Sequence, residues 1–533
     1  MLVKSLGERK MKTARALLLA NASALALSAC GGRSAPAPID PLPPADPIPP
    51  VDPNAPNYVP GTDNADSLLG SIDDDLIEGF GGNDFVLALG GNDEIYGGDG
   101  DDNIRADAGN DIIFGGPGND TIYPGDGDDK AYGGDGDDII YLSSGNDLED
   151  GGLGNDTLKI DANHSGIATT IDLMIGQYYF TAQGSSTFLN LYSIENVESN
   201  ADADLTILDT LSVNTITTGA GDDVIKSKGG NDIISTGGGN DRVELATGFI
   251  YDVNLGSGND EVVLGLTYST IDGGTGTDGL TVNSLSGVSE FYADLGAGFY
   301  FFKGVATSQD GVDALLTSFE NVTITSAMNA ELIGSDGANA IKTNGGTDQI
   351  NGMGGNDILN GGAGADTITG GAGTDTLTGG ADADTFVFGA SATDVVTYAG
   401  ADTDTANVEA ITDFVVADDT IQIADTVTFA NLTMAAGTTS ATVTYGSSDL
   451  AAGIATLTAL TAAMEADTAG TASTAAASGL QVYVFKTTAG TGLLDGKTFL
   501  VINDDTAAIA ETDVIIDITG VTGTLTSADF VIA

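Results

Sequence analysis

From Gly61 onward the chain repeats a pattern every nine residues. GGDGDDNIR, GGPGNDTIY, GGDGDDIIY and GGLGNDTLK, which start at Gly97, Gly115, Gly133 and Gly151, give the consensus G-G-x-G-x-D-x-U-x, where U is a large aliphatic residue. The glycine-rich half favours a tight turn, and the second half favours a very short strand with one inward side chain. A fixed period of this kind predicts stacked structural units rather than several ordinary globular cores.

The sixth position of the repeat is an aspartate in eleven successive units. These residues are Asp66, Asp75, Asp84, Asp93, Asp102, Asp111, Asp120, Asp129, Asp138, Asp147 and Asp156. Two units make one coil, so units eighteen residues apart would stack on the same side. Their carboxylates and turn carbonyls would then form an all-oxygen environment, which is the ligand type that Ca²⁺ takes.

These repeats resemble the calcium-binding nonapeptide repeat of the RTX (repeats-in-toxin) family. The resemblance implies an all-β fold, a parallel β-roll or β-solenoid with β-rich inserts and a C-terminal β domain. It also implies that the aspartate of position six is the side-chain ligand for Ca²⁺. With stacking at this spacing, eleven loops should give about nine sites.

Two further repeat runs follow the first. The second run is looser, and it continues through irregular units that contain Asp260 and Asp278; the third begins at Gly334 with Asn339 in place of the first aspartate. The further predicted calcium ligands are Asp223, Asp232, Asp241, Asp348, Asp357, Asp366, Asp375 and Asp384.

Position eight of the first run is predicted to point into the core. It holds Leu68, Ile77, Val86, Ile95, Ile104, Ile113, Ile122, Ala131, Ile140, Glu149 and Leu158. Ala131 would only thin the core, whereas Glu149 would bury a charge. We therefore expect the coil that contains Glu149 to be distorted or frayed, which weakens the assignment of Asp147 as a ligand.

The charge of the chain favours cations as its partners. Asp and Glu outnumber Lys and Arg by 77 to 16, and the formal net charge is -61. Such a surface repels nucleic acid and anionic lipid headgroups, so we expect no nucleic-acid partner. Without metal, the closely packed carboxylates and numerous glycines should leave the repeats unfolded, because the few buried aliphatic side chains cannot offset the entropy of ordering them.

The N-terminus is typical of an exported protein. Lys10, Lys12 and Arg15 precede an apolar run, 16–29, that is too short to span a bilayer, and residues 1–30 are predicted to be a signal peptide. Its end, LSAC, resembles the lipobox of bacterial lipoproteins, which implies lipidation of Cys30, the chain's one cysteine. We expect an extracellular or cell-surface protein, anchored in the outer membrane if Cys30 is acylated, with no other contact to a membrane.

The remaining boundaries follow from changes in composition. A proline-rich linker, 31–60, precedes the three predicted β-rolls, 61–159, 218–281 and 334–387; the inserts, 160–217 and 282–333, separate them, and a C-terminal β domain spans 388–533. The linker favours extended polyproline II. The C-terminal region resembles that of RTX and S-layer proteins exported by type I machinery, a route that rarely coexists with a lipobox.

The two inserts look like copies of one another. One contains TTIDLMIGQYYF followed by IENV, and the other contains YADLGAGFYFF followed by FENV. Their aromatic residues, Tyr178, Tyr179, Phe180, Phe299, Tyr300, Phe301 and Phe302, are expected in core or edge strands. A carbohydrate-binding platform is the alternative.

The chain is not expected to be an enzyme. Its one histidine, His164, is interpreted as a solvated loop residue, and the sequence has neither an H-E-x-x-H nor a G-x-S-x-G motif. The favoured interpretation is a calcium-folded structural or adhesive surface protein, with cell-surface polysaccharide or like protomers as possible partners. The alternatives are a polysaccharide-modifying enzyme on a β-helix scaffold and a simple calcium buffer.

Overall fold

The computed structural model describes residues 57–164, 167–180, 189–283, 285–304 and 314–388, together with short strands between residues 409 and 532. The predicted signal peptide, Cys30 and nearly all of the linker lie outside the described residues, as does most of the C-terminal region. The description below concerns the compact unit that starts at Val59. None of the helices among the described residues is long and apolar enough to cross a bilayer.

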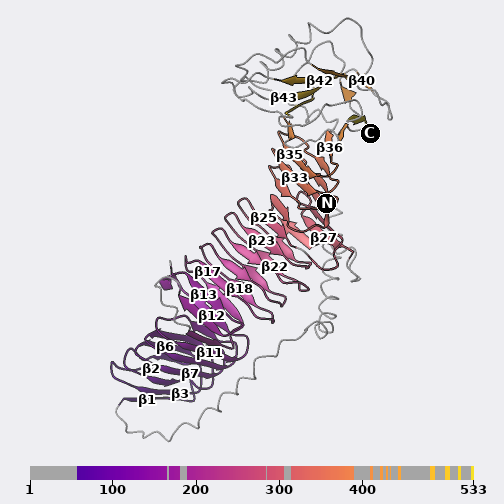
Figure 1. The fold of residues 1–533 in the computed structure, drawn as a ribbon. Coiled ribbons are helices and arrows are strands. Elements are labelled where there is room, and N and C mark those ends of the chain that lie inside the picture. Colours follow the sequence, from indigo (N-terminus) through magenta and orange to yellow (C-terminus); the bar gives the residue numbers. More distant parts are fainter. Residues whose placement is uncertain are drawn as a thin grey trace. The chain divides into compact units, whose positions relative to one another are not determined.

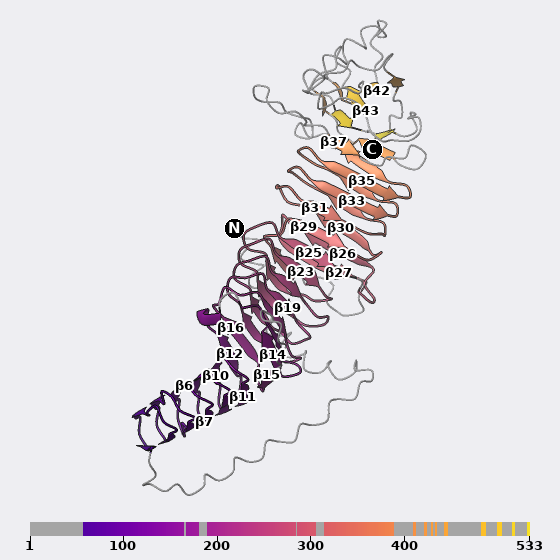
Figure 2. The same cartoon turned by 60° about the vertical axis from the view of Figure 1, so that its left-hand side comes forward.

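Successive strands alternate between two sheets, here called sheet A and sheet B. In sheet A, β3 (Leu76–Phe80) pairs in parallel with β5 (Glu94–Tyr96), so that Ile77 lies opposite Ile95. In sheet B, β4 (Phe85–Leu87) pairs in the same way with β6 (Asn103–Ala108). Figures 1 and 2 show these coils stacked side by side. The predicted all-β parallel solenoid is confirmed, with about 17 turns.

Up to residue 388, sheet A consists of coil strands, one from each coil, and of the middle strand of the first insert, β14 (Gln177–Phe180). They are β1 (Tyr58–Thr62), β3, β5, β7 (Ile112–Pro117), β9 (Lys130–Asp135), β11 (Leu148–Leu153), β13 (Thr169–Asp172), β14 (Gln177–Phe180), β15 (Leu189–Tyr192), β17 (Leu205–Leu208), β19 (Val224–Lys226), β21 (Arg242–Glu244), β23 (Glu261–Leu264), β25 (Gly279–Val282), β29 (Asn321–Ile324), β31 (Ala340–Lys342), β33 (Ile358–Ala363) and β35 (Thr376–Ala381).

Sheet B is built in the same way. Its strands are β2 (Ser67–Leu69), β4, β6, β8 (Thr121–Asp126), β10 (Ile139–Tyr141), β12 (Thr157–Ile160), β16 (Asn196–Ser199), β18 (Thr215–Thr217), β20 (Ile233–Ser235), β22 (Asp252–Asn254), β24 (Thr270–Asp272), β26 (Glu290–Asp294), β27 (Phe299–Lys303), β28 (Ala314–Thr317), β30 (Asn329–Ile333), β32 (Gln349–Asn351), β34 (Thr367–Thr369) and β36 (Thr385–Phe388).

Strands after residue 388 extend both sheets. β37 (Glu409–Ile411), β41 (Thr442–Tyr445), β42 (Gln481–Lys486), β43 (Thr498–Asn503) and β44 (Val514–Asp517) belong to sheet A, β38 (Thr420–Ile423) and β45 (Phe530–Ile532) to sheet B, and β39 (Thr428–Phe429) pairs with β40 (Leu432–Thr433). One 3-10 helix, η2 (Ala162–His164), follows β12.

The inserts are three-stranded meanders that enlarge opposite sheets. The first places β14 antiparallel between β13 and β15 in sheet A, so β15 pairs with β11 and β13 pairs with β17. The second places β27 antiparallel between β26 and β28 in sheet B. The parallel coils therefore continue through both predicted inserts, because the strands that flank each meander keep their coil-to-coil pairing.

The aromatic residues of the inserts divide between the core and the outer face. Tyr178, Tyr300 and Phe302 are buried, as expected for core strands. Phe299 and Phe301 are half-buried and stack on Tyr292, with ring planes within 20° of parallel. Tyr292 therefore covers one face of each of these two rings.

The coil that contains Glu149 is regular, contrary to expectation. Glu149 lies in β11 opposite Ala131 on one side and Leu191 on the other, so the ladder runs on without a break. Its side chain is fully buried, and the Tyr178 hydroxyl donates a hydrogen bond of 2.9 Å to its Oε1 atom. Burial, reinforced by the charge of Asp147, raises the pKa of Glu149 well above its ordinary value.

Removing the Tyr178 hydroxyl should therefore destabilise the roll. Tyr178→Phe would leave a buried carboxyl without its donor, and we expect the free energy of unfolding in saturating calcium to fall by about 1–3 kcal/mol. The control Tyr132→Phe removes a hydroxyl from the outer face and should change it by less than about 0.5 kcal/mol. Denaturant titration measures both; equal losses in the two variants would contradict the assigned role.

Candidate calcium sites

Where a repeat turn carries the three glycines of the consensus, they serve two different purposes. In the turn that starts at Gly97, Gly98 and Gly100 have φ angles of 110° and 132°, which disfavour any side chain. Gly97 has no such angle, but a Cβ atom there would lie 2.4 Å from the Asp102 Oδ2 atom and 2.6 Å from the Gly115 carbonyl oxygen. The first glycine thus leaves room where a carboxylate oxygen and a backbone carbonyl of the next coil converge.

The position-six aspartates form ladders that tie each coil to the next. The Oδ1 atom of each accepts a hydrogen bond from the backbone N–H of the aspartate eighteen residues earlier, as between Asp84 and Asp102 at 2.8 Å. One ladder runs from Asp66 to Asp156 and the other from Asp75 to Asp147. All of these carboxylates except that of Asp66 are buried.

The second carboxylate oxygen is buried without a hydrogen-bond donor in most of these turns. Among the described residues, no donor reaches the Oδ2 atom of Asp84, Asp93, Asp102, Asp111, Asp120, Asp129, Asp138, Asp156, Asp223, Asp241, Asp260, Asp278, Asp348, Asp357 and Asp366. Asp375 and Asp384 are equally buried at the corresponding positions. A buried charged oxygen is costly unless a donor or a cation compensates it, so a repeated series of such atoms points to bound cations.

Burial also makes these carboxyl groups hard to ionise in the absence of metal. Burial raises the pKa of Asp120 and Asp129 to about 7 and that of Asp102 to about 6, against the lowering effect of the backbone N–H bonds. Like charges on neighbouring coils raise these pKa values further. A divalent cation between coils would remove this penalty by compensating the charge.

The available donor atoms fit Ca²⁺. Within the described part of the chain, no three His, Cys, Asp or Glu side chains gather into a metal cluster. A cation at the turns would therefore take the Oδ2 atom of the aspartate together with backbone carbonyl oxygens. A set made of oxygen alone, without nitrogen or sulfur, suits a hard cation such as Ca²⁺. Bound calcium would supply positive charge that holds consecutive coils together.

Three of the predicted ligands in the first run already have donors. Thr62 donates its N–H and hydroxyl to the Asp66 Oδ2 atom at 2.6 and 2.8 Å, and Ser71 does the same for Asp75 at 2.6 and 3.0 Å. The Ser143 hydroxyl donates to Asp147. In each turn a Ser or Thr replaces the second glycine, a substitution that sequence reasoning had not used as a signal. These turns satisfy their aspartates without a cation.

The aspartate ladders end and restart at the IENV and FENV motifs of the two inserts. The Oε2 atom of Glu195 accepts the Asp156 N–H at 2.9 Å, and that of Glu320 accepts the Asp278 N–H at 2.7 Å. Each glutamate thus takes the place of the next aspartate. The following turns carry Asn214 and Asn339, whose Oδ1 atoms accept hydrogen bonds from Thr210 and Ser335 and whose side-chain amides donate to the Glu195 and Glu320 carbonyls. The sequence showed the duplication but not this role.

Asp260 and Asp278 are full members of the second ladder. The N–H of Asp241 donates to Asp260 and that of Asp260 donates to Asp278, at 2.8 and 2.9 Å. The one extra residue between Asp241 and Asp260 is accommodated without loss of this bond. In the third run Asp348, Asp357, Asp366, Asp375 and Asp384 continue the same pattern.

A second, outer ladder uses position five of the repeat. Asn and Asp side chains there accept the backbone N–H of the corresponding residue one coil later, as Asp101 does from Asn119 and Asn119 does from Asp137, both at 2.9 Å. The preference for Asn or Asp at this position is visible in the sequence. Its purpose emerges only when the coils are stacked.

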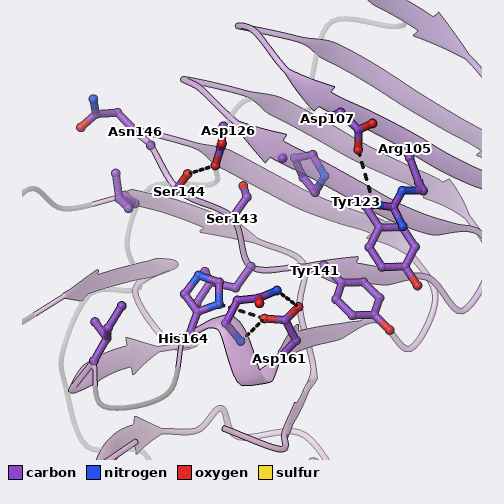
Figure 3. Close-up of a pocket in the computed structure, with 17 residues that line it drawn as sticks. Arg105, Asp107, Tyr123, Asp126, Tyr141, Ser143, Ser144, Asn146, Asp161 and His164 are labelled. Carbon is purple, nitrogen blue, oxygen red and sulfur yellow. Dashed lines mark hydrogen bonds and ion pairs between the residues drawn. The ribbon is translucent and has the colours of Figure 1, made fainter. Parts of the chain in front are cut away.

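His164 lies against a cavity and is not a solvated loop residue. Its side chain is 12% exposed, and its Nδ1 atom lies 3.3 Å from Asp161 Oδ1. A cavity of about 680 Å³ borders this pair, and Tyr123, Tyr141 and Ser143 also line it (Figure 3). The prediction that His164 is a solvated loop residue was wrong, because the short helix Ala162–His164 lies beside strand residues of sheet B, including Tyr123 and Tyr141.

Stacked coils, glycine turns and buried aspartates with an uncompensated oxygen define a calcium-binding β-roll. Comparison with family models matches the RTX calcium-binding nonapeptide repeat at residues 60–95, 88–122, 96–131, 123–158, 210–243, 326–359, 333–368 and 351–386. These segments are RTX repeats, and they bind calcium. The ladder continues through Asp260 and Asp278, beyond the matched residues. A comparison with curated proteins finds no match.

Two glycines of one turn should respond very differently to substitution. A Cβ atom at Gly79 would lie 2.4 Å from Asp84 Oδ2 and 2.1 Å from the Gly97 carbonyl oxygen, whereas at Gly81 the nearest atom is 3.7 Å away. We expect Gly79→Ala to remove one calcium ion from the number bound per chain and to destabilise the roll by about 1–3 kcal/mol. Equilibrium dialysis measures the number of bound ions.

The control Gly81→Ala should bind as many calcium ions as the wild type and stay within about 1 kcal/mol of its stability. Equal binding by the Gly79→Ala variant would contradict the placement of the cation beside the first glycine.

Proposed function

We propose that the chain is an exported cell-surface structural or adhesive protein whose roll folds when it meets extracellular calcium. The observation that carries this proposal is the series of buried aspartate oxygens without a donor, repeated from coil to coil. Such a structure is unfavourable where calcium is scarce and becomes favourable where calcium is abundant. The chain would therefore fold only after it reaches a compartment that is rich in calcium.

Several properties support export. RTX repeat proteins are typically secreted, and extracellular calcium modules bind at about 10⁻⁴ to 10⁻³ M. At such affinities the cytosol would leave the repeats unfolded and ready for export. A lipid attached to Cys30 after removal of the signal peptide would then tether the roll through the proline-rich linker. The formal charge of -61 keeps the folded surface soluble and favours cations as partners.

The proposed role is non-enzymatic. The described residues that face the cavity beside His164 include Arg105, Asp107 and Asp126, but these bind one another or neighbouring turns: Arg105 pairs with Asp107, and Ser144 donates to Asp126. Tyr123 lies against Arg105 and stacks on Tyr141. A sugar could therefore not stack on the ring faces that take part in these two contacts. These contacts support a structural outer face.

A calcium-dependent change of fold is the main test. In metal-free buffer at about pH 7.5, we expect the circular dichroism spectrum of a largely disordered chain. After addition of about 1 mM calcium, we expect the spectrum of β-structure. Magnesium at the same concentration serves as the control, because it demands a smaller octahedral site and should not replace calcium. An unchanged spectrum after calcium addition would rule out calcium-driven folding.

Acid should partly substitute for calcium in the same experiment. The pKa values of Asp120 and Asp102 are raised in the folded state to about 7 and about 6, above the ordinary 3.8, so the folded state holds protons more tightly than the unfolded chain. The stability of the calcium-free roll is therefore greatest below pH 3.8 and is lost as the pH rises through 6 to 7. Calcium binding weakens on acidification because protons compete for the same oxygens.

The second candidate function is a polysaccharide-modifying enzyme, and the cavity beside the Asp161–His164 pair favours it. We expect the calcium-loaded protein to release no product from acidic polysaccharides, as followed by size-exclusion chromatography. Product release that His164→Ala abolishes, while Asn163→Ala leaves it intact, would overturn the structural proposal in favour of the enzyme.

A further inference from the structure

Asp209 occupies a position that the repeat reserves for glycine. It takes the first place of the turn that ends at Asn214, and its side chain is fully buried. Its Oδ1 atom accepts the backbone N–H of Lys228 on the next coil. No donor among the described residues reaches its Oδ2 atom. Asp209 is outside the residues that match the RTX repeat and is not a position-six aspartate.

A second buried carboxylate faces Asp209 from the next coil. Asp232 accepts the Asn214 N–H at 2.9 Å through Oδ1 and the Ser227 hydroxyl at 2.9 Å through Oδ2. The Lys228 N–H donates to Asp209 and the hydroxyl of the adjacent Ser227 donates to Asp232, so two neighbouring residues of one turn bring the two carboxyl groups together. Two carboxylates can approach this closely in a buried place only if a proton or a cation lies between them.

The surroundings of the pair consist of oxygen atoms. The Ser227 hydroxyl lies 3.0 Å from the hydroxyl of Tyr251, which is itself buried. Within the described residues, no Lys, Arg or His side chain forms an ion pair with Asp209 or Asp232. The buried charge is therefore uncompensated by the protein, and the possible ligands are carboxylate and hydroxyl oxygens, which suit a hard cation.

We propose that Asp209, with Asp232 and the Ser227 hydroxyl, binds one calcium ion, so that the turn that ends at Asp232 gains a carboxylate ligand that the nine-residue pattern does not supply. The other position-six sites would combine one aspartate with backbone carbonyl oxygens. Here two carboxylates from consecutive coils share the ion, and the side chain of Asp209 fills the space that glycine leaves elsewhere. The site lies where the second run begins after the first insert, so the ion would join the coil of β17 to the first coils of that run.

The substitution Asp209→Asn tests this site in the full-length chain. It keeps the size of the side chain, removes one charge and supplies a donor to Asp232. We expect equilibrium dialysis to show one calcium ion fewer per chain. We also expect the melting temperature to fall in calcium, where a ligand is lost, and to rise in metal-free buffer, where repulsion is removed. Asp252→Asn, which removes an exposed charge from neighbouring β22, should change neither quantity.

A second variant reports on the site even if Asp209→Asn folds poorly. Tyr251 should sensitise the luminescence of terbium bound beside Ser227, so Tyr251→Phe should lose part of the tyrosine-sensitised emission while Tyr179→Phe should not. An unchanged calcium count together with a higher melting temperature of Asp209→Asn in both buffers would overturn the proposal, because it would show a shared proton. Unchanged emission in Tyr251→Phe would overturn it as well.

The inference rests on calcium binding by the repeats, and the same dialysis separates the two. A wild-type chain that binds no calcium would contradict calcium binding throughout the roll. A wild-type chain that binds calcium, with the same number of ions in the Asp209→Asn variant, would contradict this site alone.

Discussion

Each coil of the roll depends on an aspartate that is buried although its charge is only half satisfied. One carboxylate oxygen holds the preceding coil through a backbone N–H, and this bond fixes the stacking distance. The other oxygen lies inside the turn with no donor in most repeats. Because the protein supplies the first contact and a cation must supply the second, metal binding and coil stacking are one event.

The roll has two ways to complete such a turn, and it uses them in different places. Ser or Thr at the second position of the turn donates hydrogen bonds to Asp66, Asp75 and Asp147, at the start and at the end of the first run. Glycine, or another residue without a hydroxyl, at that position leaves the oxygen for calcium. Turns with their own donors lie where a neighbouring coil is missing or irregular, so a complete calcium cage could not form there.

The two inserts show how the repeat tolerates interruption. Each meander adds strands to one sheet only, and a glutamate from the duplicated motif then closes the ladder that the insert interrupts. The next turn restarts with an asparagine that needs no cation. The three runs of aspartate turns are thereby divided by two junctions, and Asp209 lies at the first of them.

The sequence by itself determined the parallel coils, the inward aliphatic positions and the aspartates of position six. These features depend on contacts at a constant offset of eighteen residues, which a period of nine residues displays directly. Asp260 and Asp278 were visible as irregular units, and only the ladder showed them to be full members. The outcome at Glu149 depended on Tyr178, 29 residues further on.

Only the tertiary structure decided which distant residues complete the coils next to the inserts. Glu195 meets Asp156 across 39 residues and Glu320 meets Asp278 across 42, because the meanders between them fold out of the coil and bring its ends together. In a regular repeat, residues that contact each other on neighbouring coils are always the same number of residues apart in the sequence. An insert changes that number, so the residue that makes the contact is decided by how the insert packs in space.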